Sequence, residues 1–105
     1  MKTTVIVGST RDVARERLEL MRDGGRIKKR MWYDEATSDG SLILAMDGAP
    51  ENICWLRGLG LHIEEIIIVK PDGISEEMGK YINYVRSAIE WQRRARNDQS
   101  TTEDV

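Results

Sequence analysis

The hydrophobic pattern of the chain alternates between short β-branched runs and longer amphipathic stretches. Residues 3–7 and 63–70 are rich in valine and isoleucine, and we expect them to form parallel strands buried in the centre of a sheet. The stretches from Thr10 to Gly24 and from Ser75 to Asn97 have apolar positions at helical spacing. They predict two helices, and the second is long enough to overhang the sheet.

The middle of the chain predicts a hairpin and a short helix. Residues 26–33 alternate as in a half-exposed edge strand, residues 34–40 are rich in turn formers, and residues 41–46 are again apolar. Pro50 then suits the start of a helix of about two turns. We therefore predict a small open three-layer, Rossmann-like α/β sandwich, with a mostly parallel sheet of three or four strands and about three helices.

Length and composition fit one folded unit. The 105 residues are 40% hydrophobic and 32% charged, so residues 1–97 are assigned to a single α/β domain. Residues 98–105 are polar and lack an apolar period, which predicts a flexible tail. No apolar stretch approaches the roughly 18 residues that span a bilayer, so we expect a cytoplasmic protein without a membrane partner.

Charge and residue counts limit the chemistry. The net charge of −2 gives no global basic field, so any nucleic-acid binding is expected to be weak and local. One cysteine excludes an internal disulfide, and with only one histidine few ligands remain for a transition metal. Asp47, Glu65 and Lys70 do not have the spacing of a nuclease site. We predict no catalytic residue, no metal and no cofactor.

The turn Gly8-Ser9-Thr10-Arg11 follows the first strand and opens the first helix. Free amides, two hydroxyls and a guanidinium at that position could bind a phosphate or contact a nucleic-acid backbone. An ordinary glycine turn with a Ser/Thr cap and a solvated arginine explains the same residues. The string is similar to the phosphate-binding Gly-Ser-x-Arg turn of flavodoxin-like flavin reductases, which are much longer proteins.

A broader resemblance covers about residues 4–90. Residues 5–14 (VIVGSTRDVA), the hairpin at 26–46, LRGL at 56–59 and IIIV at 66–69 resemble one RecA-like lobe of helicase and phage terminase motor proteins. The resemblance implies Thr10 and Arg11 as contacts to a nucleic-acid backbone. The Gly-rich loop with Gly-Lys-Ser/Thr that holds nucleotide phosphates in that family is absent, so ATP hydrolysis is not supported.

The last predicted helix carries a second line of large side chains beside its core stripe. Tyr84 and Trp91 lie seven residues apart, and Arg93 and Arg94 follow them. Aromatic residues and arginine often anchor interfaces, so we expect these four residues to form the contact of a two-fold homodimer. Compensation of the helix dipole and solubility also explain the arginines.

These observations favour a non-catalytic interaction or accessory module that binds a protein or nucleoprotein partner. Its size and the RecA-like resemblance suggest a viral or mobile-element type of protein. The alternative is a small Rossmann-like protein or enzyme that binds a nucleotide or flavin phosphate at Gly8–Arg11. The sequence does not identify the partner or the ligand.

Overall fold

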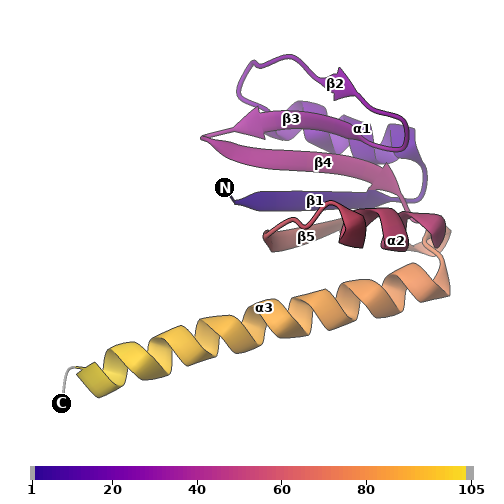
Figure 1. The fold of residues 1–105 in the computed structure, drawn as a ribbon. Helices are drawn as coiled ribbons and strands as arrows, with labels where there is room; N and C mark the ends of the chain where they lie inside the picture. The colour runs from indigo at the N-terminus through magenta and orange to yellow at the C-terminus, as the bar shows by residue number, and fades with distance from the viewer. Residues whose placement is uncertain (1, 104–105) are drawn as a thin grey trace.

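The computed structural model describes residues 2–103, of which residues 97–103 are described only as backbone (Figure 1). Strands and helices alternate along the chain, as the hydrophobic pattern predicts. In chain order the elements are β1 (Thr3–Gly8), α1 (Arg11–Met21), β2 (Lys28–Lys29), β3 (Asp34–Ser38), β4 (Ser41–Asp47), α2 (Glu51–Gly58), β5 (Ile63–Val69), the 3₁₀ turn η1 (Pro71–Gly73) and α3 (Glu76–Glu103).

The sheet is mixed. Over residues 2–103 it has five strands in the order β2-β3-β4-β1-β5, with β4 and β5 parallel to β1. Strand β3 is antiparallel to β4, and β2 is antiparallel to β3. The α/β class is confirmed, whereas the prediction of a mostly parallel sheet with three or four strands is wrong. The difference comes from the hairpin: its second strand lies at Ser41–Asp47, as predicted, but its first strand is Asp34–Ser38 and not residues 26–33, where only the short β2 forms.

The hairpin turns at Asp39-Gly40, five residues after the position where the turn was predicted to begin. Ser38 pairs with Ser41, and Asp39 and Gly40 both have positive φ, at 51° and 77°. Two positive φ values are the signature of the tight type I′ hairpin turn, for which Asp-Gly is a favoured sequence. The sequence of β3 is polar and was therefore assigned to a loop, although its residues pair with β4 along the whole strand.

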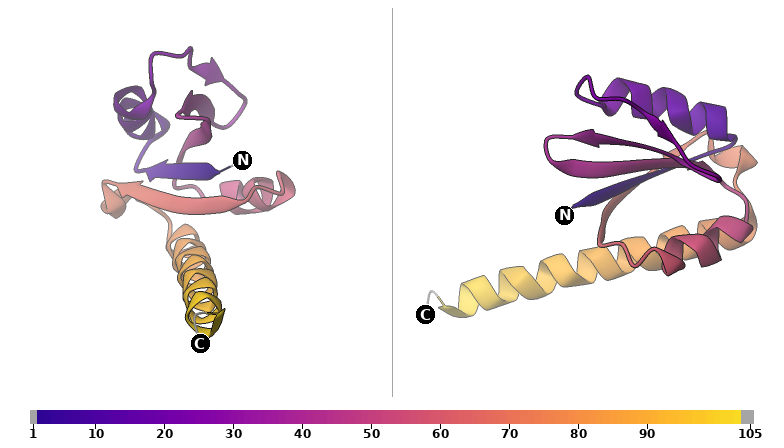
Figure 2. Two further views of the ribbon diagram at one scale, coloured as in Figure 1. Left: turned by 90° about the vertical axis from the view of Figure 1, so that its left-hand side faces the viewer. Right: turned by 45° about the horizontal axis from the view of Figure 1, so that its top comes forward.

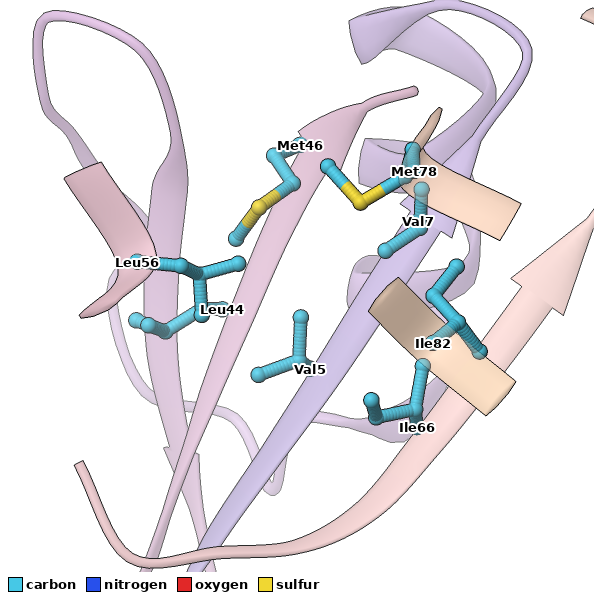
Figure 3. Close-up of a cluster of buried hydrophobic side chains, with 8 residues drawn as sticks. All are labelled: Val5, Val7, Leu44, Met46, Leu56, Ile66, Met78 and Ile82. Atoms are coloured by element: carbon cyan, nitrogen blue, oxygen red, sulfur yellow. The ribbon is translucent and has the colours of Figure 1, made fainter. Parts of the chain in front are cut away.

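Helices cover both faces of the sheet, which gives three layers. Figure 2 (left) shows α1 on one side and α2 on the other. The α1 face buries a cluster of six residues: Ile6, Ala14, Leu18, Ala36, Ile43 and Ala45. The opposite face packs against α2 and the first half of α3 through a larger cluster (Figure 3): Val5, Val7, Leu44, Met46, Leu56, Ile66, Met78 and Ile82. Alternate residues of β1 and β4 thus point to opposite cores.

Strand β5 lies at the edge of the sheet, not in its centre as predicted. It pairs with β1 on one side, and α3 passes below its other side in Figure 1. From α3, the Nη2 of Arg86 donates a hydrogen bond to the carbonyl oxygen of Ile66 at 2.8 Å. A helix that covers an open edge reduces unwanted strand pairing. The apolar residues of β5 have the pattern of a central strand because α3 covers the edge of β5 where a further strand would otherwise pair.

Helix α3 extends well beyond the sheet. Its 28 residues span about 42 Å, and its second half projects past the strands in Figure 1. The radius of gyration is accordingly 15.0 Å, against about 13 Å for a compact chain of this length. The overhang is confirmed, but the helix continues through Glu103, so its predicted end at Asn97 is wrong. The last two residues of the predicted tail lie outside the described residues.

Neither α3 nor any other helix in residues 2–103 is long and apolar enough to cross a membrane.

Gly8, just before α1, lies in a tightly packed place, and Gly79 in α3 lies in open space. A Cβ on Gly8 would lie 2.8 Å from the Ala14 nitrogen and 2.9 Å from the Thr10 carbonyl oxygen, whereas a Cβ on Gly79 in α3 meets nothing within 4 Å. We expect Gly8→Ala to destabilise the protein by about 1–3 kcal/mol. Gly79→Ala should stabilise it by about 0.5–1 kcal/mol, because alanine favours the helix. Urea unfolding measures both, and equal effects would contradict this packing.

Candidate functional site

The three parallel strands end together at one edge of the sheet, where α/β proteins usually bind ligands. The loops after β1, β4 and β5 meet there around an open depression of about 470 Å³. Its lining comes from these loops: Ser9, Thr10, Arg11, Asp47, Gly48, Ala49, Asp72, Gly73, Ile74 and Ser75. The predicted anion-binding turn therefore lies where a ligand would be expected.

Contacts within the fold occupy several polar groups of this turn. The hydroxyl of Thr10 accepts a hydrogen bond from the Val13 amide at 3.2 Å and caps α1. The Ser9 amide donates to the Val69 carbonyl oxygen at 3.2 Å. A Cβ on Gly73 would come within 2.3 Å of the Ser9 Cβ, so the η1 backbone lies directly against the turn. The Thr10 hydroxyl and the Ser9 amide therefore make hydrogen bonds that hold the fold together.

Arg11 makes the most extensive contacts of the predicted site residues. Its Nε and Nη2 donate to the two carboxylate oxygens of Asp34 at 3.2 and 3.1 Å. Its guanidinium also donates to the carbonyl oxygens of Arg30, Met31 and Tyr33 at 2.6, 2.9 and 2.8 Å. Asp34 is 1% exposed. We call Arg11, Asp34 and these three carbonyls the arginine clamp.

The arginine clamp gives Arg11 a structural role that the sequence did not predict. A buried carboxylate is costly unless a charged partner and hydrogen bonds compensate it, and Arg11 supplies both. The guanidinium joins the start of α1 to β3 and to the 30–33 loop. The guanidinium donors are thus already engaged, and the acidic side chains of Asp47 and Asp72 line the same depression and would repel an anion. Anion binding at Gly8–Arg11 stays a prediction.

The predicted interface residues all lie on α3, with Tyr84 in its first half alongside the sheet and the other three in its second half. Tyr84 is 70% exposed and Trp91 is 72% exposed. Arg94 is exposed beside them and pairs with Glu90 of its own helix at 3.4 Å. Arg93 instead lines hollows between α3 and β5 together with Glu64. The structure therefore brings three of the four residues to one side of the helix.

A pair of tryptophans was missed by the sequence analysis. The ring centroids of Trp32 and Trp55 lie 5.5 Å apart, and Tyr33 packs edge-on against Trp32 at 4.6 Å. The two tryptophans come from the 30–33 loop and from α2, which meet only in the folded chain. The adjacent aromatic residues Trp32-Tyr33 in a polar neighbourhood were the available signal.

No known family model, curated protein or solved structure matches this chain. Function must therefore be inferred from geometry, and the RecA-like resemblance stays a prediction. Among residues 2–96, whose side chains the structure describes, no three His, Cys, Asp or Glu side chains gather where they could hold a metal ion.

The arginine clamp predicts a large loss of stability when its cation is removed. We expect Arg11→Met to destabilise the protein by about 3–5 kcal/mol, because Asp34 then stays buried without a partner. The double variant Arg11→Met/Asp34→Leu should recover most of that loss. Arg15→Met removes an exposed pair with Glu19 and should cost less than about 1 kcal/mol. Chemical unfolding compares the variants. A small effect of Arg11→Met would leave Arg11 available for a ligand role.

Proposed function

We propose that the protein is a non-catalytic interaction module that associates with a second copy of itself through the outer side of α3. The observation that carries this proposal is the exposure of Tyr84 and Trp91, at 70% and 72%, on a helix that projects past the sheet. Large aromatic side chains gain most from burial at interfaces. The core does not need them, because Met78 and Ile82 already fix α3 to the sheet.

A coiled-coil type of spacing supports helix pairing. Apolar residues recur at alternating intervals of three and four residues along one side of α3: Tyr81, Tyr84, Ala88, Trp91 and Ala95. We call this line the α3 seam. It lies beside the stripe that packs on the sheet, and Tyr81 also packs against the edge of that core. From Tyr84 onward large and small residues alternate, which suits interdigitation with another helix.

An antiparallel arrangement matches the α3 seam to itself. Aligning Tyr84 with Ala88 of the second copy also aligns Tyr81 with Trp91 and Glu77 with Ala95. Tyr84 of each copy then faces the small side chain of Ala88, Tyr81 and Trp91 face each other on either side, and the reciprocal contacts satisfy two-fold symmetry. Arg57 of α2 lies over the Tyr81 ring, 5.3 Å from its centroid, and would border the pairing of Tyr81 with Trp91.

The charges of α3 favour the same alignment. Its first turn carries Glu76 and Glu77. In the antiparallel register, Glu77 lies beside Arg94 of the second copy. Lys80 also approaches that arginine, but Lys80 pairs with Glu76 of its own helix at 3.6 Å. Attraction between opposite ends is available only when the helices run in opposite directions.

We expect the protein to be a dimer by sedimentation equilibrium, and Trp91→Ala or Tyr84→Ala to weaken the dimer at least about tenfold, as truncation of an interface anchor does. The matched control is Leu20→Ala, which removes an apolar side chain that is 82% exposed on α1. It should leave the mass unchanged. A monomer at all concentrations, or a dimer unaffected by both α3 variants, would refute the proposal.

The register is tested in the same experiment. Glu77→Lys and Arg94→Glu should each weaken the dimer, and the double variant should restore it, because the charge pair is then reversed rather than lost. Restoration also distinguishes helix pairing from a nonspecific loss of folding. Independent effects of the two changes would contradict this register while leaving Trp91 as the anchor.

A further inference from the structure

A second surface lies at the carboxyl end of the sheet, away from the α3 overhang. In Figure 1 the starts of β3 and α2 lie at the end where the β4 arrow points. Between the 30–33 loop and α2 is a depression of about 280 Å³. We call it the tryptophan pocket, and its lining residues are Arg11, Met31, Trp32, Asp47, Ala49, Glu51, Asn52 and Trp55.

The aromatic walls of the tryptophan pocket are open to a ligand. The planes of Trp32 and Trp55 are inclined by 47°, so the two rings form a wedge and do not stack flat on one another. Trp55 is 50% exposed, and Trp32 is partly exposed. The face of a tryptophan ring carries negative potential and attracts cations more strongly than the ring of any other side chain.

The charged groups around the tryptophan pocket also favour a cation. Asp47 and Glu51 supply two carboxylates, and the charge of Arg11 is compensated by Asp34. One oxygen of Asp47 accepts hydrogen bonds from the Ala49 amide at 3.0 Å and from the Asn52 side-chain amide at 2.8 Å, which fixes that carboxylate in place. An anion would meet uncompensated negative charge here, whereas a cation would meet two ring faces and two carboxylates.

We propose that the tryptophan pocket binds an organic cation with an alkylammonium head group. The head group would lie in the wedge between Trp32 and Trp55, with Glu51 and Asp47 as counter-charges. Such head groups occur on free amines and on lysine side chains of partner proteins, and both present the same chemistry. The site is separate from the α3 seam, so the two proposals stand or fall independently.

The arginine clamp holds this pocket in shape before a ligand arrives. Trp32 lies in the segment whose carbonyls at Arg30, Met31 and Tyr33 accept hydrogen bonds from Arg11. Trp55 is anchored on the other side by α2, where Leu56 and Asn52 are buried. A site whose walls are fixed by contacts behind them loses less entropy on binding.

The test compares choline with its neutral isostere 3,3-dimethyl-1-butanol, while the indole N–H signals of the three tryptophans are followed by NMR. We expect choline to shift the signals of Trp32 and Trp55 and to leave Trp91, which lies on α3, unchanged. The alcohol has the same shape without the charge, so it should bind about 2- to 30-fold more weakly. Equal binding of the alcohol, or equal shifts at all three indoles, would overturn the proposal.

Matched variants assign the binding to the pocket. Trp55→Leu and Glu51→Gln should each reduce choline affinity at least about twofold. Glu76→Gln makes the same change in the first turn of α3 and should have no effect. Unchanged affinity in both pocket variants would contradict the site, and retention of the other indole shifts in the spectrum shows that each variant is folded.

The two sources of the head group are separated by further titrations. Tighter binding of N-acetyl-lysine methylamide or its trimethylated form than of choline would support a protein side chain, and the reverse would support a free amine. Adenosine is the neutral stacking control. If adenosine shifts the Trp32 and Trp55 signals at lower concentration than any of the cations, the pocket is a base-stacking site and the proposal fails.

Discussion

The ion pair between Arg11 and Asp34 is the contact on which the carboxyl end of the sheet depends. Asp34 is 1% exposed at the start of β3, a position where an unpaired carboxylate would oppose folding. Arg11 reaches it from the first residue of α1 and also binds three carbonyls of the preceding loop. One side chain therefore ties the start of α1 to the start of β3 and to the 30–33 loop, in addition to the pairing of β1 with β4 that already joins the first β-α unit to the hairpin.

The protein carries two surfaces of different kinds, and the arginine clamp shapes only one of them. At the carboxyl end of the sheet it holds the 30–33 loop against α2, so that Trp32 and Trp55 face a common space. Helix α3 is fixed independently by Met78, Ile82 and the bond from Arg86 to β5. The proposed helix pairing and the tryptophan pocket therefore use different parts of the molecule.

The sequence predicted those features that depend on local pattern. Strand β1, the Thr10 cap of α1 and the exposed side of α3 follow from periodicity and capping, which need only neighbouring residues. Strand β3 was missed because its inward positions are Asp34 and Ala36, and an aspartate appears suited to a strand only when its distant partner Arg11 is known. The position of β5 was misjudged because periodicity does not distinguish a neighbouring strand from a covering helix. The Trp32–Trp55 contact joins two elements through tertiary structure alone.

The most direct test of the central role of Arg11 is NMR of the arginine side chains. A guanidinium held by five hydrogen bonds should rotate slowly about its C–N bonds and exchange its protons slowly with water. We predict separate, persistent Nη–H signals for Arg11, while Arg15, whose single ion pair is exposed, gives one averaged signal. Averaged and rapidly exchanging Arg11 signals, identical to those of Arg15, would contradict the arginine clamp.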